Sequence, residues 1–249
     1  MRALLLTSGL LLIGVPVLRA AEKKDAQAEA VAAIKKVKGT VQVDEDARGK
    51  PVVLVSLYGP KVTDKSLAHL KALSRLQVLS LNGTKITDAG LAHIEGLKAL
   101  RYLSLDSARV TDAGLAHLKG LKKLSTLILL NTPIGDAGLE HLQGLTGLES
   151  LALNSTRVTD AGLKHLQGLT HLQDLELRTA KVTDAGLAHL KGLKDLRRLG
   201  LYGTDVTDAG LKHLRGLSKL QTLGLIGTDV TDAGAKDLQK ALPRLKIER

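Results

Sequence analysis

The sequence predicts an α/β fold of the solenoid type, in which one short strand and one short helix repeat along the chain. First, the tripeptide Val-Thr-Asp, or a near copy, recurs every 24 residues without insertion. Second, the apolar residues of each unit switch from a spacing of two, typical of strands, to a spacing of three, typical of helices. Third, 44% of the 249 residues are hydrophobic but only 1% are aromatic. The core is therefore expected to consist of many similar layers of aliphatic side chains.

Each unit is expected to form a strand followed by a helix. The eight tripeptides end at Asp64, Asp88, Asp112, Asp136, Asp160, Asp184, Asp208 and Asp232. In the second unit Leu79 and Leu81 have strand spacing, and Leu91 and Ile94 have helix spacing after the aspartate. The aspartate precedes Ala-Gly-Leu, so it is expected to cap its own helix rather than to bind calcium. Gly96 is expected to end the helix in the left-handed conformation.

The repeated unit resembles the leucine-rich repeats of bacterial proteins that carry the pattern TDAGLxHLxxL. The pattern is related to the cysteine-containing and ribonuclease-inhibitor-type repeats, and the resemblance covers about residues 52–247. It implies a curved solenoid with parallel strands on the concave face and short helices on the convex face. The usual Asn or Cys after the strand is replaced by Thr in five copies, by Ala108 and Ala180 in two, and by Pro60 in the first. The five threonines, whose hydroxyls are expected to bond the neighbouring loop backbone, are Thr84, Thr132, Thr156, Thr204 and Thr228.

The N-terminus has the layout of a secretory signal peptide. Met1-Arg2 is basic, residues 3–18 carry no charge, and the small residues Ala20 and Ala21 precede a charged stretch. The apolar run has 16 residues, fewer than the ~20 that a spanning helix needs. We therefore expect an exported protein, periplasmic or secreted, with an uncleaved membrane anchor as the alternative. The chain has no cysteine, which excludes disulfides and thiolate chemistry and fits a bacterial envelope or secreted protein.

Both ends of a solenoid need caps, because a terminal repeat otherwise exposes its core. At the N-terminus we expect a helix over residues 25–38, with Asp25 at its start and Gly39 as its stop, and then strands over 40–43 and 52–57. At the C-terminus Ala235 and Asp237 replace the repeated Leu and His. The expected organisation is a signal peptide at 1–20, an N-terminal cap at 21–51, eight repeats at 52–234 and a C-terminal cap at 235–249.

A row of histidines also follows the repeat. Its members lie on the side of the predicted helix away from the leucines, so we expect surface positions rather than metal ligands. They are His69, His93, His117, His141, His165, His189 and His213. The sequence has no Gly-rich phosphate loop, nucleophile elbow or His-Glu-x-x-His helix. We therefore expect no enzymatic activity, no catalytic residue, no metal and no cofactor.

The concave face is the predicted binding surface. Residues between the buried strand leucines point away from the core, and the tyrosines all fall among them. Tyr and Arg are frequent anchors of protein interfaces. The candidate contact residues are Tyr58, Tyr102, Ile128, Leu130, Asp174, Glu176, Arg178, Arg198, Tyr202 and Ile226.

One edge of the solenoid offers a second candidate surface. The position after the threonines is basic in most repeats and acidic in the last two. Its cations, which could bind an anionic ligand, are Lys61, Lys85, Arg109, Arg157 and Lys181. The formal charge of +11 supports such attraction. We expect a monomer that binds a protein through the concave face. The alternative is a structural envelope component that binds glycan or an anionic surface through the basic edge, and nucleic acid is not expected.

Overall fold

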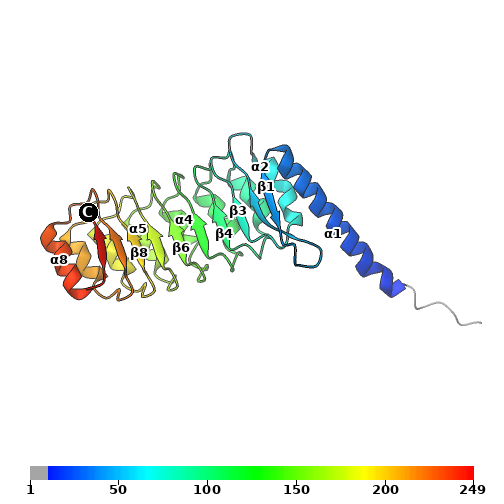
Figure 1. Ribbon diagram of the computed structural model, residues 1–249. Helices are drawn as coiled ribbons and strands as arrows, with labels where there is room; N and C mark the ends of the chain where they lie inside the picture. Colours follow the sequence, from blue (N-terminus) through cyan, green and yellow to red (C-terminus); the bar gives the residue numbers. More distant parts are fainter. Residues whose placement is uncertain (1–10) are drawn as a thin grey trace, which may run out of the picture.

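The computed structural model describes residues 11–249 as an elongated stack of repeats (Figure 1). Within this part of the chain ten strands form one sheet, and their order in the sheet is their order in the sequence. The helical segments line the other side of the stack (Figure 1). The solenoid fold predicted from the 24-residue period is confirmed. Residues 1–10 of the expected signal peptide lie outside the described residues.

The strands are short and their register follows the repeat. β1 and β2 form an antiparallel hairpin, and every later strand is parallel to the one before it. Residues that face each other across the parallel strands are 24 positions apart, as Leu79 and Leu103 are. The strands are β1 (Thr40–Val43), β2 (Val52–Ser56), β3 (Val78–Ser80), β4 (Tyr102–Ser104), β5 (Thr126–Ile128), β6 (Ser150–Ala152), β7 (Asp174–Glu176), β8 (Arg198–Gly200), β9 (Thr222–Gly224) and β10 (Lys246–Glu248).

Each repeat contributes one helical segment that starts at its aspartate. In most repeats a single α-helical turn passes into a 3-10 turn, because 24 residues leave no room for a longer helix. The segments are α2 (Asp64–Leu67), η1 (Ala68–Ala72), α3 (Asp88–Leu91), η2 (Ala92–Ile94), η3 (Asp112–Leu118), α4 (Asp136–Glu140), α5 (Asp160–Leu163), η4 (Lys164–Leu166), α6 (Asp184–Leu187), η5 (Ala188–Leu190), α7 (Asp208–Leu211), η6 (Lys212–Leu214) and α8 (Asp232–Ala241).

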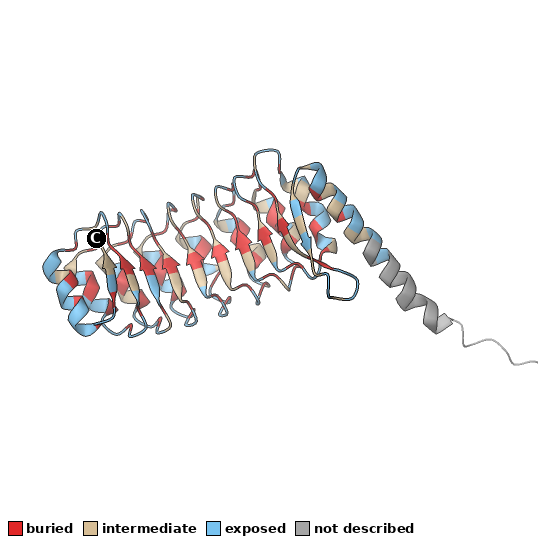
Figure 2. Ribbon diagram, in the orientation of Figure 1, coloured by how far each residue is buried: buried red, intermediate tan, exposed pale blue. Residues whose placement is uncertain are grey.

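The core is one continuous aliphatic layer between the sheet and the helical segments (Figure 2). Among the described residues, the buried hydrophobic side chains are Leu, Ile, Val and Ala only. Each repeat places its leucines against those of the next, as in Leu79, Leu103 and Leu127 on successive strands. Burying a leucine contributes about 2 kcal/mol, and only the stack provides that burial.

The N-terminal helix differs from the expected one. α1 (Leu11–Lys36) begins well before residue 25, because the preceding residues 19–24 are mostly strong helix formers. Asp25 lies inside the helix, so its predicted role at the helix start is wrong. Lys38 adopts the left-handed conformation with φ of 62°. Gly39 is needed for close packing, since a Cβ there would lie within 3.0 Å of Ile34.

This helix and the β1–β2 hairpin pack against the first repeat. Ala30 and Ile34 of α1 are buried against the core, and β1 covers the edge of β2. The hairpin lies where the sequence predicted two strands. Within residues 11–249, none of the helices combines the length and the apolar character that a membrane span requires.

Within the repeats, the left-handed positions lie after the strands, not at the ends of the helical segments. Gly96 is not among them, because the helical segment closes there through 3-10 turns, with the N–H of Leu97 donating to the carbonyl of Ile94 at 2.9 Å. The expectation for Gly96 is therefore wrong. One position per repeat instead has φ between 54° and 84°, where the chain leaves the sheet. These residues are Gly59, Gly83, Ser107, Asn131, Ser155, Thr179, Gly203 and Gly227.

The repeated aspartates join neighbouring repeats, so the expectation that each caps its own helix is wrong. Thr87 occupies the N-cap before Asp88, and its backbone N–H and hydroxyl donate to the two carboxylate oxygens of Asp64 at 2.8 and 2.7 Å. Asp112 makes only the backbone bond, at 2.7 Å, because Gly135 has no hydroxyl. The full pair recurs at Asp88, Asp136, Asp160, Asp184 and Asp208.

The glycine of each Asp-Ala-Gly makes room for the aspartate of the preceding repeat. A Cβ on any of these glycines would lie within 3.0 Å of that carboxylate. The first repeat has no aspartate before it, and it carries Ser66 at this position. The glycines are Gly90, Gly114, Gly138, Gly162, Gly186, Gly210 and Gly234.

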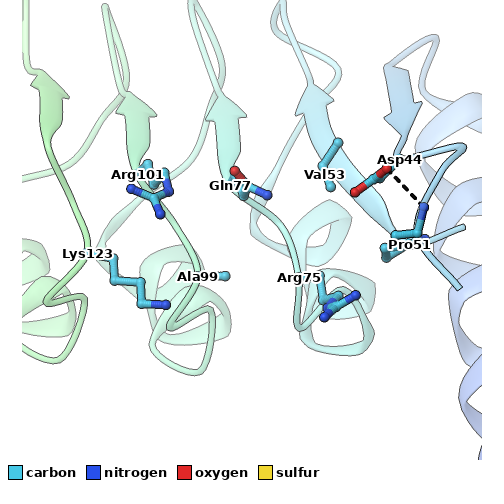
Figure 3. A pocket seen from close by; sticks show the side chains of 9 residues that line it. Asp44, Pro51, Val53, Arg75, Gln77, Ala99, Arg101 and Lys123 are labelled. Carbon is cyan, nitrogen blue, oxygen red and sulfur yellow. Dashed lines mark hydrogen bonds between the residues drawn. The ribbon is translucent and has the colours of Figure 1, made fainter.

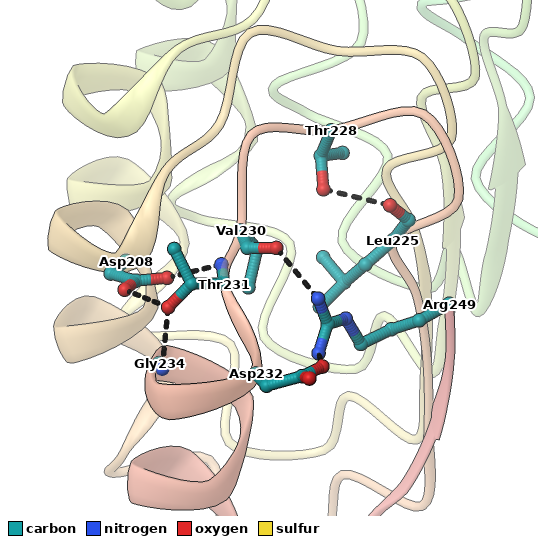
Figure 4. A network of polar contacts seen from close by, with 8 residues as sticks. All are labelled: Asp208, Leu225, Thr228, Val230, Thr231, Asp232, Gly234 and Arg249. Carbon is teal, nitrogen blue, oxygen red and sulfur yellow. Dashed lines mark hydrogen bonds and ion pairs between the residues drawn. The ribbon is translucent and has the colours of Figure 1, made fainter.

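Arg249 contacts the aspartate of the eighth repeat (Figure 4). Asp208 bonds Thr231 of this repeat, as in most of the repeats before it. The guanidinium of Arg249 pairs with Asp232 and donates to the carbonyl of Val230 at 2.9 Å. Arg249 thus joins the end of β10 to the start of α8.

Replacing Gly162 by Ala is expected to lower the free energy of unfolding by about 2 kcal/mol, because the methyl group would collide with Asp136. Gly168→Ala in the same repeat is the control, since no atom lies within 4 Å of a Cβ there. The control should change stability by less than about 0.5 kcal/mol. Chemical denaturation measures both, and equal effects of the two variants would contradict the packing argument.

Acid should weaken the contacts between repeats. Hydrogen bonds from the Thr231 hydroxyl and backbone hold the pKa of Asp208 below its ordinary value of 3.8. A lowered pKa in the folded state means that stability is present above the ordinary pKa and is lost as the pH falls through the folded-state pKa. We expect Asp208→Asn to lose less stability than the native chain between about pH 5 and pH 2.

The control for this experiment is Asp229→Asn. The Asp229 side chain is exposed and makes no hydrogen bond or ion pair with the described residues. This variant should keep the native dependence on pH in thermal melts. The same flattening in both variants would show that loss of any negative charge explains the result.

Candidate binding face

The concave face consists of the side chains that point away from the core along β2 to β10. Because the strands are in register, these side chains form columns of residues 24 positions apart. The structure places the predicted contact residues in these columns, and each is half-buried or exposed. Tyr58 and Ile226 are the most open large apolar side chains described, with exposed fractions of 59% and 55%.

The tyrosines do not form one aromatic surface. Tyr58 and Tyr202 share a column but are six repeats apart, about 29 Å at 4.8 Å per strand. Tyr102 lies in a different column, between Val78 and Thr126 of the adjoining strands. The prediction that all tyrosines lie on this face is compatible with the structure, but they lie at three separate positions along it.

The charged residues do come together, in a group that we call the C-terminal cluster: Asp174, Glu176, Arg178, Arg198, Tyr202 and Glu248. Nε of Arg198 lies 2.6 Å from a carboxylate oxygen of Asp174 on the adjacent strand. The guanidinium carbon of Arg178 lies 4.6 Å from the centre of the Tyr202 ring, within cation–π range. The Tyr202 hydroxyl donates to Glu248.

Two glycines create the space for this cluster. A Cβ on Gly200 would lie within 3.0 Å of the Glu176 carboxylate, and one on Gly224 would lie within 3.0 Å of the Tyr202 ring. Both side chains therefore lie flat over the following strand. Glu248, which the sequence reasoning missed, comes from the last strand, where its pairing with Lys246 at 3.1 Å also fixes it.

The surroundings shift the pKa values of three members of the cluster. Burial raises the pKa of Glu176, and the positive charges of Arg178 and Arg198 only partly oppose this effect. The hydrogen bond to Glu248 raises the pKa of Tyr202 and lowers that of Glu248. The Glu176 carboxylate has no hydrogen bond or ion pair with another described residue. It is thus a half-buried carboxylate ready to accept a hydrogen bond from a bound molecule.

The basic edge lies where the chain leaves the sheet. All five cations are exposed, and none forms an ion pair with the described residues. In four of them, all but Lys61, the backbone N–H donates to a carbonyl of the preceding repeat, as from Lys85 to Val62 at 3.0 Å. Asp205 and Asp229 occupy the same column at its C-terminal end and are also exposed.

The histidines lie on the helical segments, where they are exposed or half-buried. Nδ1 of His189 contacts the amide of Gln167 in the preceding repeat at 2.9 Å, and His117 pairs with Glu95 in the same way. In His141, Nδ1 is buried without a partner, because the equivalent position in the preceding repeat is Lys119. Among the described residues, no three His, Asp or Glu side chains converge as a metal site.

The threonine column has a structural role within its own repeat. The hydroxyl of Thr84 donates to the carbonyl of Leu81 at 2.8 Å, three residues earlier in the same turn. The other four threonines make the same bond. Ala108 and Ala180 are buried at the equivalent position and keep the backbone part of the turn, with N–H to carbonyl distances of 3.0 Å.

Comparison with known proteins agrees with this geometry. The family model of the leucine-rich repeat region matches residues 55–249. No curated protein matches the sequence significantly. Among solved structures, internalin C2 from Listeria monocytogenes superposes with a TM-score of 0.66 and 24% identity, covering 89% of this chain and 92% of internalin C2.

Two other solved structures share the fold at lower similarity. A leucine-rich repeat protein of Leptospira interrogans gives a TM-score of 0.54 and 21% identity, over 73% of this chain and 51% of its own. The plant peptide hormone receptor RGFR1, in complex with RGF2, gives a TM-score of 0.54 and 15% identity, over 82% of this chain and 36% of its own. At these identities the likeness concerns the fold alone.

Proposed function

Because the chain belongs to the leucine-rich repeat family, we propose that it is a non-enzymatic binding protein that recognises a partner protein through its concave face. Such solenoids offer an extended surface for binding. The plant receptor of the same fold is itself in complex with RGF2, which supports a binding role. Nine parallel strands at about 4.8 Å give a face about 38 Å long, enough for a protein interface of ordinary size.

The observation that carries this proposal is the C-terminal cluster. Two arginines, a tyrosine and a half-buried carboxylate are side chains that frequently dominate interface energies. Ile226, in the same column as Arg178 and Tyr202, adds an exposed apolar side chain beside them. We infer that a partner donates hydrogen bonds to Glu176 and presents a carboxylate or carbonyl to Arg178.

The partner can be sought by affinity capture from a bacterial envelope extract with three full-length baits. The native chain should capture a protein that an Arg178→Glu, Arg198→Glu bait recovers about tenfold less, because two anchors would repel the partner instead of attracting it. The matched control is Arg157→Glu, Lys181→Glu, which makes the same change of charge on the basic edge. Thermal melts establish that all baits fold.

The outcomes separate the two surfaces. Loss of the partner only from the cluster variant supports the concave face. Loss only from the edge variant, with strong dependence on salt, supports a structural envelope component that binds an anionic surface through the five exposed lysines and arginines. Equal recovery by all three baits contradicts both proposals.

We also propose that the protein is an exported monomer, with its signal peptide at residues 1–20 and with caps at residues 21–51 and 235–249 around the repeats. Cleavage after Ala20 or Ala21 leaves the part of α1 that carries the buried Ala30 and Ile34.

Expression with the native N-terminus in a bacterial host should give a periplasmic protein that begins at Ala21 or Glu22, as measured by intact mass. A full-length species in the membrane fraction would support the uncleaved anchor instead, and a full-length cytoplasmic species would contradict export.

A further inference from the structure

A hollow of about 380 Å³ lies at the edge of the sheet where the chain enters the strands, opposite the basic edge (Figure 3). Its lining comes from the hairpin and from the segments just before β3, β4 and β5. Three cations surround it: Arg75, Arg101 and Lys123. This volume falls within the range of small-ligand sites.

The hollow exists because of one small residue in a repeated column. Ala99 lies between Arg75 and Lys123, each exactly one repeat away, and its methyl group leaves space that a longer side chain would fill. Gln77 and Arg101 line it from the start of the adjacent strands (Figure 3). Successive repeats thus place their cations around a gap.

The lining of the hollow carries more positive than negative charge. All three cations are exposed, and none forms an ion pair with the described residues. The one acidic residue of the lining is Asp44, where an oxygen accepts the N–H of Ala47 at 3.2 Å. The formal charge of the lining is therefore +3 from the cations and −1 from the aspartate, a net +2.

We propose that this hollow binds a phosphomonoester carried by a hydroxylated molecule. A phosphomonoester carries up to two negative charges near neutral pH, which matches the net charge, and arginines bind its oxygens through paired hydrogen bonds. Asp44 and Gln77 lie beside the cations and suit the hydroxyl groups of the carrier, since a carboxylate accepts hydrogen bonds and an amide both donates and accepts them. This site is separate from the C-terminal cluster and does not depend on the proposed partner.

The test is calorimetric titration of the full-length chain with glucose 6-phosphate, with inorganic phosphate and glucose as comparison ligands. Glucose 6-phosphate should bind with a Kd below about 1 mM and more tightly than either comparison ligand. Arg101→Gln and Ala99→Leu should each weaken binding about tenfold or more, the first by removing a donor and the second by filling the gap. Arg197→Gln, at the equivalent position four repeats later, is the control and should leave binding unchanged.

A second arm determines whether the phosphomonoester belongs to a soluble molecule or to a lipid headgroup. The native, Arg101→Gln and Arg197→Gln chains are sedimented with phosphatidylcholine vesicles that contain phosphatidic acid. If only the Arg101→Gln chain fails to sediment with the vesicles, the result supports the site with a lipid headgroup as the source. If Arg101→Gln loses binding in the titration but not in the vesicle assay, the result supports a soluble source. Equal weakening by Arg101→Gln and Arg197→Gln, or no binding in either arm, overturns the proposal.

Discussion

The carboxylate shared between neighbouring repeats is the interaction on which the rest of this structure depends. Six of the eight aspartates accept the backbone N–H and hydroxyl of the threonine in the next repeat and lie against the glycine of that repeat. The Thr-Asp-x-Gly pattern follows from this geometry, because Thr and Gly contact the aspartate of the preceding repeat and Asp contacts the Thr and Gly of the following repeat. The constant spacing follows as well, since an inserted residue would move the donors away from the acceptors. Hydrogen bonds to a charged group contribute about 1.5–3 kcal/mol each, so the series stabilises the stack along its whole length.

Much of the fold could be predicted from periodicity, because both the strand spacing and the helix spacing recur within each unit. The direction of the aspartate contacts could not. A carboxylate placed before Ala-Gly-Leu is as suitable for capping its own helix as for bonding a threonine 23 residues away, and spacing along the chain does not distinguish the two. The column of left-handed residues could not be predicted either, because its residue type varies between repeats. Glycine fills it at Gly59, Gly83, Gly203 and Gly227, but Ser, Asn and Thr occupy the repeats between.

The candidate site could be predicted only as far as alternation along each strand determines which side chains point away from the core. That rule placed Asp174, Glu176, Arg178 and Arg198 on one face, and the parallel register brought them together. It did not identify Glu248, which lies outside the repeat pattern and contacts Tyr202 across 46 positions of sequence. The alternation rule also did not predict the hollow beside Ala99. A small residue leaves a gap only where the side chains at the same position of the preceding and following repeats are long.

The uniform parallel register has a consequence for how such a protein changes its length. Because most internal junctions have the same partners, recombination between two copies of Asp-Ala-Gly adds or removes whole layers and leaves the cut faces matched. The copies at Asp136 and Asp160 lie between Lys123 of the hollow and Asp174 of the cluster, so recombination between them would leave both sites intact. Each layer between them moves the two sites apart by about 4.8 Å. The number of repeats therefore sets the distance between two surfaces whose own residues need not change.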